Sequence, residues 1–481
     1  MERVQVLTWI KRGGAIFFAA LLMLLITFSL FTKSHLDSFK SDLKSGSSLE
    51  AVNRSAKVLS NDVNIIFTVL DLPIIKQVLG IAGVDFTQIR DEIGAVIEAA
   101  PNLAGINAPK KYLIVFQNSA EARGTGGIMG AYAIVELNNG NLKVIRTGSN
   151  EPLYGLSLEK IPIDVPAEFL KLYGQNPAII QNSNLSPHFP YGAEIWLALW
   201  QKKYNENLDG VIAVDPTALS YILRATGPLK MDSGIEISDK NVVAETLKDA
   251  YKRYESDNHA RKQYLVEIMN VASAKLQTGE YSKLKLAKAI RDGILENRIL
   301  FYSTDKGVQS QISKVRLGGA MQLSPNNEYR AVIQNIDAGK LDYYLDRDIK
   351  ISSKTCGVNR QSEVRVKVTN SLASAAGLPA YVLTRSDKDK PKDLIPGSHR
   401  FKLFIYGPTN SKLVSVWREN KSANLGGAAT ERGRPVYVAD VDLAPGGSEE
   451  LLANFKGGEG RITFVKQPLV RDATLTIKDN C

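Results

Sequence analysis

An arginine beside a run of glycines is the part of this 481-residue chain best suited to chemistry. The run reads Glu121-Ala-Arg123-Gly-Thr-Gly126-Gly127. Glycines let main-chain amides approach an anion closely, and a guanidinium can bind a phosphate through two parallel hydrogen bonds. Arg123, Gly126 and Gly127 are therefore candidate ligands of a phosphate group. The same residues also suit a tight turn that leads into a hairpin, with Arg123 paired to Glu121.

Other catalytic signatures are missing from the sequence. There is no nucleophile elbow of the GxSxG type, no Walker loop for phosphates and no HExxH zinc motif. The chain has four histidines and two cysteines, and no CxxC pair. A histidine-based metal site and a structural zinc site are therefore not expected.

The segments around the arginine follow the pattern of an α/β fold. An apolar run at 111–116 predicts a buried strand, and segments 131–137 and 142–145, joined by Asn138-Asn139-Gly140, predict a hairpin. Residues 209–228 read as strand, helix and stop, with Asp215 suited to the N-cap and Pro216 to the first helical position. Further helices are expected at 240–254, 258–276 and 282–296. These elements predict a central α/β domain at 110–351.

The last third of the chain changes to short alternating segments separated by turn residues. This pattern predicts an antiparallel β-sandwich at 352–481. Cys356 and Cys481 bracket that block, so an exported protein could join them in a disulfide, or they are two unrelated thiols. Two strand-like segments, 112–118 and 329–335, share a Tyr and a Gln-Asn pair at the same spacing. They suit neighbouring strands of one sheet, or a chance similarity.

The N-terminus carries an uncharged stretch at 13–32. About twenty apolar residues span the hydrocarbon core of a membrane, and no A-x-A cleavage site follows, which indicates an uncleaved signal anchor. The alternative is a buried helix of a soluble domain. The expected arrangement is a cytoplasmic tail at 1–12, a single-pass helix in the plasma membrane, a helical stalk at 33–109 and an extracytoplasmic body.

The net charge of +10 comes from scattered Lys and Arg with acidic residues among them. No basic block with interleaved aromatic residues appears, so nucleic acid is not the expected partner. A diffuse positive field suits a membrane surface, a lipid phosphate or an anionic envelope polymer.

Four motifs in order resemble a bacterial family called domain of unknown function 4012. They are Tyr112-Leu-Ile-Val-Phe-Gln-Asn-Ser-Ala-Glu-Ala-Arg-Gly-Thr-Gly-Gly127, Asn184-Leu-Ser-Pro-His-Phe-Pro190 with Trp196, Asp209-Gly-Val-Ile-Ala-Val-Asp-Pro-Thr-Ala-Leu219 with Thr226-Gly-Pro228, and Leu341-Asp-Tyr-Tyr-Leu-Asp-Arg347. Together they extend over about 110–351. This resemblance implies an architecture more than a function, because the family has no settled activity.

A more distant likeness is to the LytR–CpsA–Psr enzymes, single-pass extracytoplasmic proteins that move glycopolymers from polyprenyl pyrophosphate to peptidoglycan. Segment 209–228 looks like their strand–helix–glycine segment, and Asp257-Asn-His-Ala-Arg261-Lys262-Gln263 looks like the start of their Arg-x-x-Arg-Gln helix. The likeness implies that Arg123 and Arg261 hold the pyrophosphate, with Lys262 beside them. It also implies Mg²⁺ held by carboxylates, for which Asp164 and Asp215 are the candidates.

Departures from these families bear on the metal. The enzymes follow their first Arg with an Asp that helps to hold magnesium, whereas Gly124 and Thr125 follow Arg123 in this chain. His188 stands where relatives in the closer family tend to have an acidic residue. Asp215 also suits a helix cap, and Arg261 a solvated position on a helix.

The sequence thus predicts an α/β protein with a transmembrane helix, a helical stalk, a mixed-sheet central domain and a C-terminal antiparallel β-sandwich. Two classes of function fit it. One is a phosphotransferase that attaches a polyprenyl-linked or anionic glycopolymer to the cell wall. The other is a non-catalytic envelope module that binds such a polymer or acts as a scaffold. The retained pair of arginines favours the first class, and the missing Asp favours the second.

Overall fold

The computed structural model describes the chain almost continuously from residue 108 to its end. The described residues are 34–35, 37–38, 41, 51, 54–55, 57–58, 61, 99, 102–105, 108–139, 141–324, 326–357, 360–385 and 391–481. The predicted anchor at 13–32 and most of the predicted stalk at 33–109 lie outside them. None of the helices in the described part of the chain is both long enough and apolar enough to cross a membrane.

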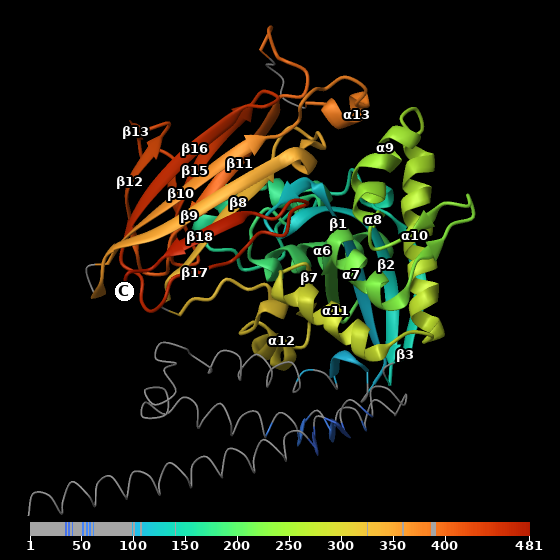
Figure 1. Ribbon diagram of the computed structural model, residues 1–481. Helices are drawn as coiled ribbons and strands as arrows, with labels where there is room; N and C mark the ends of the chain where they lie inside the picture. The colour runs from blue at the N-terminus through green and yellow to red at the C-terminus, as the bar shows by residue number, and fades with distance from the viewer. Residues whose placement is uncertain are drawn as a thin grey trace, which may run out of the picture. The chain divides into compact units, whose positions relative to one another are not determined.

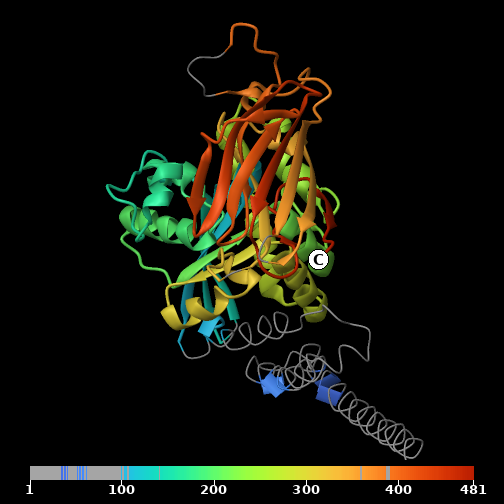
Figure 2. The ribbon, with the colours of Figure 1, turned by 90° about the vertical axis from the view of Figure 1, so that its left-hand side faces the viewer.

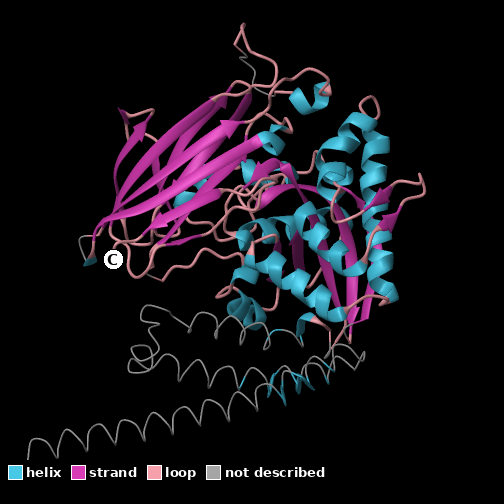
Figure 3. Ribbon diagram, viewed as in Figure 1, coloured by secondary structure: helices cyan, strands magenta, loops and turns pink. Residues whose placement is uncertain are grey.

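The chain divides into two units. The first comprises Met1–Pro109 with Asn138–Gly140, and the second comprises Lys110–Leu137 with Asn141–Cys481. The second unit carries the strands and helices described below. It is a mixed α/β structure with several sheets, as the sequence predicts (Figures 1 and 3).

A five-stranded sheet forms the centre of the α/β part, in the order β3-β2-β1-β4-β7. Strand β1 pairs antiparallel with β2 and parallel with β4, and β4 pairs antiparallel with β7. The sheet is therefore mixed, and the predicted hairpin is confirmed. The strands are β1 (Lys110–Arg123), β2 (Gly126–Asn138), β3 (Asn141–Ser149), β4 (Gly210–Val214) and β7 (Ile299–Ser303).

Helices cover both faces of this sheet. Because strand residues alternate between faces, Leu113 and Val115 of β1 join Trp196 of α6 in one core, whereas Phe116 faces a cavity beside α7 and α10. The helices are α5 (Ala167–Tyr173), α6 (Phe189–Tyr204), α7 (Pro216–Thr226), α8 (Val242–Ala244), α9 (Ala250–Arg253), α10 (Asn258–Thr278), α11 (Lys283–Leu295) and α12 (Lys306–Ile312). A π-helical turn, Glu245–Asp249, joins α8 to α9, and a small hairpin follows α7, formed by β5 (Leu229–Lys230) and β6 (Glu236–Ile237).

Two further sheets pack face to face as a β-sandwich, which lies toward the viewer in Figure 2. One has the order β13-β12-β16-β10-β9-β18 and the other β14-β15-β11-β8-β17. The strands are β8 (Glu328–Asn335), β9 (Leu345–Thr355), β10 (Gln361–Asn370), β11 (His399–Tyr406), β12 (Lys412–Arg418), β13 (Lys421–Ala423), β14 (Ala428–Glu431), β15 (Arg434–Leu443), β16 (Ser448–Lys456), β17 (Thr463–Phe464) and β18 (Thr474–Lys478). A helical turn, α13 (Ala380–Leu383), lies between β10 and β11.

The sandwich differs from the sequence prediction in two respects. It is not purely antiparallel, because β17 pairs parallel with β8 and β18 pairs parallel with β9. These edge strands come from the end of the chain, which returns alongside the two strands that open the sandwich. The predicted boundary at 351–352 falls within β9, and β8 already belongs to the sandwich. Strands β1 and β8, which share the Tyr and Gln-Asn spacing, lie in different sheets.

The sheet that contains β8 joins the sandwich to the α/β part. One of its faces contributes Ile333 and Phe401 to the sandwich core. The other face contributes Val332 and Phe404 to the core around α6. Both faces are therefore buried, which explains why this whole region forms one unit.

A disulfide ties down the C-terminus. Cys356 and Cys481 are joined, with 5.6 Å between their Cα atoms and 125 positions between them in sequence. Of the two alternatives left by the sequence, the structure contains the disulfide. The bridge attaches the last residue of the chain to the segment that follows β9.

Candidate functional site

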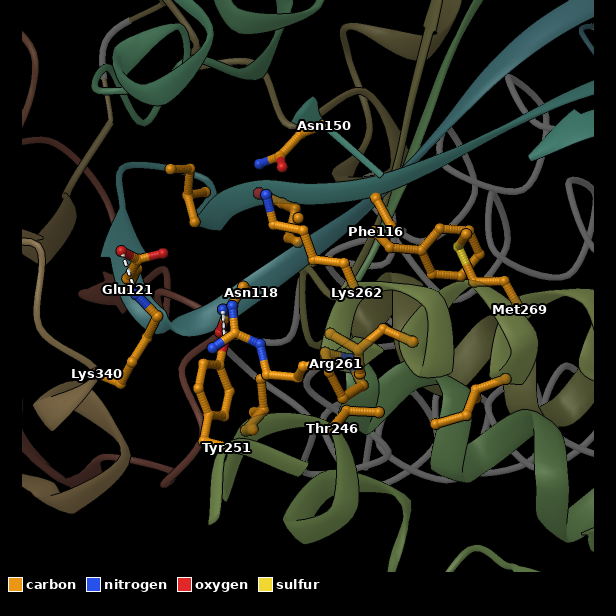
Figure 4. A pocket seen from close by; sticks show the side chains of 18 of the residues that line it. Phe116, Asn118, Glu121, Asn150, Thr246, Tyr251, Arg261, Lys262, Met269 and Lys340 are labelled. Carbon is orange, nitrogen blue, oxygen red and sulfur yellow. Dashed lines mark hydrogen bonds and ion pairs between the residues drawn. The ribbon is translucent and has the colours of Figure 1, made fainter. Parts of the chain in front are cut away.

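A cavity of about 90 Å³ lies between strands β1 and β2 and helices α7 and α10. Most of its wall is apolar, formed by Phe116, Ile128, Leu219, Leu265, Ile268 and Met269. Figure 4 shows Phe116 and Met269 on the right of the view and the charged Glu121 and Lys340 on the left. The cavity thus suits an elongated ligand that has an apolar body and a polar head.

Three cationic side chains from two parts of the chain line the polar end. Arg261 and Lys262 are the fourth and fifth residues of α10, which begins after its N-cap Asp257. Lys340 comes from the loop that follows β8. All three are buried, with 4%, 8% and 2% of their surface exposed, respectively. Burial of a charge is costly unless the charge is paired, so the partners of each cation matter.

Each of the two lysines has a carboxylate partner. Lys340 Nζ lies 2.6 Å from Glu121 Oε1, and Lys262 Nζ lies 3.0 Å from Glu151 Oε1. Burial is the largest influence on the pKa of Lys340 and would lower it, but Glu121, Tyr251 and Tyr381 together outweigh burial, and the pKa is raised. The hydrogen bond from Lys262 lowers the pKa of Glu151. Lys340 and Glu151 therefore stay charged near neutral pH.

Arg261 differs from the lysines, because no described carboxylate forms an ion pair with it. Its guanidinium carbon lies 4.2 Å from the ring centroid of Tyr251 and 4.3 Å from that of Tyr381, and one terminal nitrogen donates to Asn258 Oδ1. Its Nε is buried and has no hydrogen-bond partner among the described residues. Three cations and two carboxylates leave one excess positive charge, centred on Arg261. An anion beside the guanidinium would balance this charge.

The structure places Arg123, Gly126 and Gly127 in a different role. They form the buried turn between β1 and β2 and do not line the cavity. The guanidinium of Arg123 donates to three main-chain carbonyls, of Gln181, Ala122 and Asn335, at 2.9, 2.9 and 3.0 Å. A Cβ on Gly127 would lie 2.1 Å from a main-chain oxygen of β1. These features fit the alternative of a tight turn, but Arg123 bonds to carbonyls and not to Glu121.

The two candidate metal ligands do not form a site. Asp215 uses one carboxylate oxygen to cap α7 through Ala218 N at 2.7 Å, and the other lies 2.7 Å from Arg298 Nη1. Asp164 is exposed in the segment before α5. No group of three or more His, Cys, Asp or Glu side chains suited to a metal occurs within the described ranges. These residues do not fit the Mg²⁺ that the enzyme likeness implies, and the helix-cap interpretation of Asp215 holds.

Several residues of the cavity were missed by the sequence analysis. Lys340 and Tyr251 lie in segments read only as structural, and Tyr381 lies in the predicted sandwich. No local signal could have found Tyr381, because it reaches Arg261 across 120 positions of sequence. The sequence suggests Glu121 only as a partner for Arg123, whereas the structure places it in the cavity wall, paired with Lys340.

Part of the chain is similar to a known family. Residues 107–251 match the model of a family described as protein of unknown function, DUF4012. The match supports the resemblance carried by the first three motifs. It covers β1, β2, Glu121 and Tyr251, and it ends before Arg261 and Lys340. No curated protein shows significant sequence similarity to the chain.

Three solved structures show partial likenesses. The transcriptional regulator yvhJ of Bacillus subtilis is 12% identical over 46% of this chain and 83% of its own, with a TM-score of 0.24. Protein gbs0355 of Streptococcus agalactiae is 15% identical over 44% of this chain and 74% of its own, with a TM-score of 0.27. A Legionella pneumophila protein described as nutrient-binding is 8% identical over 29% of this chain, with a TM-score of 0.17, and the chain spans 47% of its length. At these identities and TM-scores the likenesses identify neither a ligand nor a reaction.

Proposed function

We propose that this protein binds a polyprenyl-phosphate-linked glycan of the cell envelope, with the phosphate at Arg261 and the polyprenyl chain along the apolar wall of the cavity. The observation that carries the proposal is the buried guanidinium of Arg261, which has no carboxylate partner within the described part of the chain and lies at one end of an apolar cavity. A neutral apolar ligand would leave this charge unpaired. A soluble anion would leave the apolar wall uncovered.

The proposed setting is the outer face of the plasma membrane. The uncharged stretch at 13–32 would anchor the chain, and the unit that holds the cavity would lie outside the cytoplasm. A polyprenyl-linked glycan is carried in that membrane, so the anchor would keep the binding site close to its ligand. Protease added to intact spheroplasts should then digest the body of the protein.

Transfer of the glycan to the cell wall is a second candidate function, and it rests on the likeness of 209–228 and of the Arg261 segment to the LytR–CpsA–Psr enzymes. Binding alone is the better supported of the two. Both carboxylates at the polar end, Glu121 and Glu151, are already paired with lysines. Release of a glycan from a polyprenyl pyrophosphate carrier by the purified protein would establish the transfer.

The test of the binding proposal compares three ligands: one with both a phosphate head and a polyprenyl tail, one with the tail alone and one with the phosphate alone. Full-length protein in detergent is titrated calorimetrically with geranylgeranyl phosphate, with geranylgeraniol and with inorganic phosphate. The phosphate lipid should bind most tightly, because only it satisfies both ends of the cavity. Arg261→Ala should weaken its binding by about 10- to 100-fold, since a hydrogen-bonded charge contributes about 1.5–3 kcal/mol.

Arg291→Ala is the matched control, because Arg291 is exposed on α11 and does not line the cavity. It should bind the phosphate lipid as the wild type does. Equal binding of the alcohol and the phosphate, or unchanged affinity in a folded Arg261→Ala variant, would reject the proposal.

A further inference from the structure

The side-chain amide of Asn118 is oriented by the main chain. Ala120 N donates a hydrogen bond to Asn118 Oδ1 at 3.1 Å. A main-chain N–H can only donate, so the oxygen of the amide must face Ala120 and its nitrogen must face away. That nitrogen, Asn118 Nδ2, lies 2.7 Å from the hydroxyl oxygen of Tyr251 (Figure 4).

The direction of this second hydrogen bond follows from the first. An amide nitrogen has only protons to give, so the Tyr251 oxygen accepts, and the proton of the hydroxyl is directed elsewhere. None of the described residues accepts that proton in a hydrogen bond. Tyr251 is 3% exposed and lines the cavity, with its ring against the guanidinium of Arg261. A buried donor without an acceptor is therefore held at the cationic end of the cavity.

We propose that Tyr251 donates this proton to an anionic oxygen of the ligand head bound at Arg261, and that Asn118 is the positioning residue that keeps the hydroxyl in this direction. The inference rests on the proposed function and refines it. Arg261, Tyr251 and the two lysines are donors, and the carboxylate of Glu121 at the same end is already paired with Lys340. These donors suit a phosphate oxygen, which accepts hydrogen bonds.

The protonation state of Tyr251 agrees with this role. Burial raises the pKa of its hydroxyl, although Lys340 and Arg261 act in the opposite direction. The hydroxyl thus keeps its proton at neutral pH. It can stabilise a phosphate oxygen without adding a negative charge beside it.

The test compares two conservative variants of the full-length protein by titration with geranylgeranyl phosphate. Tyr251→Phe keeps the ring that packs on Arg261 and removes only the donor, so affinity should fall about tenfold or more. Affinity for geranylgeraniol should not change, because that ligand lacks the anionic oxygen. Tyr254→Phe is the control, because Tyr254 is the residue directly after α9 and does not line the cavity.

Asn118→Leu provides the second measurement. This substitution removes the hydrogen bond that fixes the direction of the Tyr251 hydroxyl. As a single change it should weaken binding of the phosphate lipid. In the Tyr251→Phe background it should add nothing, because the donor that it positions is already gone. A purely structural role for Asn118 would instead give the same loss in both backgrounds, which would overturn the inference.

The outcomes separate this inference from the proposed function. If Arg261→Ala loses affinity and Tyr251→Phe does not, the inference is wrong and the binding site stands. If neither variant changes affinity, both are wrong. If Tyr251→Phe fails to fold, the Asn118→Leu variant decides: unchanged phosphate-lipid affinity in that variant overturns the inference, and a loss confined to the phosphate lipid supports it.

Discussion

Replacement of Arg123 should reduce stability and leave ligand binding largely intact, because the structure makes this residue a cross-link between main-chain segments. Its guanidinium donates hydrogen bonds to three main-chain carbonyls. Ala122 belongs to β1, Gln181 to the segment before α6, and Asn335 to β8. Arg123 is 6% exposed. Burial lowers its pKa, against the raising effect of nearby carboxylates.

The expected loss follows from these three bonds. With about 1.5 kcal/mol for each hydrogen bond from a charged donor, Arg123→Ala should lower the free energy of unfolding by about 4.5 kcal/mol. Arg123→Lys should recover little, because an ammonium cannot reach three separated carbonyls as a planar guanidinium does. Arg291→Ala, an exposed change on α11, should alter stability by no more than about 0.5 kcal/mol.

Equilibrium unfolding in urea, followed by tryptophan fluorescence, measures this loss. The buried Trp196 and Trp200 of α6 report on the core beside the sheet. A geranylgeranyl phosphate titration of the same variants, below the unfolding transition, gives the affinities. The reasoning is refuted if Arg123→Ala unfolds at the wild-type urea concentration but no longer binds the lipid. That result would return Arg123 to the ligand site.

Three other predictions test the fold. Cys481→Ser should lower stability by up to about 5 kcal/mol on the chain-entropy model, because the lost disulfide closes 125 positions; urea unfolding measures this, and thiol labelling of the wild type should find no free cysteine. Gly127→Ala should prevent stable folding, because the added Cβ would lie 2.1 Å from a main-chain oxygen. Gly130→Ala on the same strand should fold, because its Cβ would lie 3.5 Å from the nearest atom. Thermal melts of the two variants measure the difference. Burial would lower the pKa of His399, but Asp342 and Asp337 together outweigh burial and raise it, so the stabilisation from charged His399 is complete below about pH 6.5 and is lost as pH rises through the higher folded value. His399→Gln should flatten the pH profile of urea unfolding on that side, and an unchanged profile would contradict the assignment.

The local parts of the fold were readable from sequence. The strand, cap and helix at 209–228 were predicted because Asp215 and Pro216 act through contacts within one turn. The hairpin of β2 and β3 and the sandwich strands were predicted because alternation with a period of two reflects one strand at a time. The parallel pairings of β17 and β18 were not, because the direction in which a distant strand returns leaves no local pattern.

The candidate site divides in the same way. The sequence singled out Arg123 because of its glycine-rich neighbours, and Arg261 through the likeness to the LytR–CpsA–Psr enzymes. Only the tertiary structure distinguishes them. Main-chain carbonyls from three segments accept hydrogen bonds from Arg123, whereas Arg261 lines the cavity and forms no ion pair with a described carboxylate. Two residues complete the cationic end of the cavity: Lys340, which lies in the loop after β8, and Tyr381, which lies in the sandwich region. The sequence therefore determined which side chains could bind a phosphate, and burial together with long-range packing decided which one is left to do so.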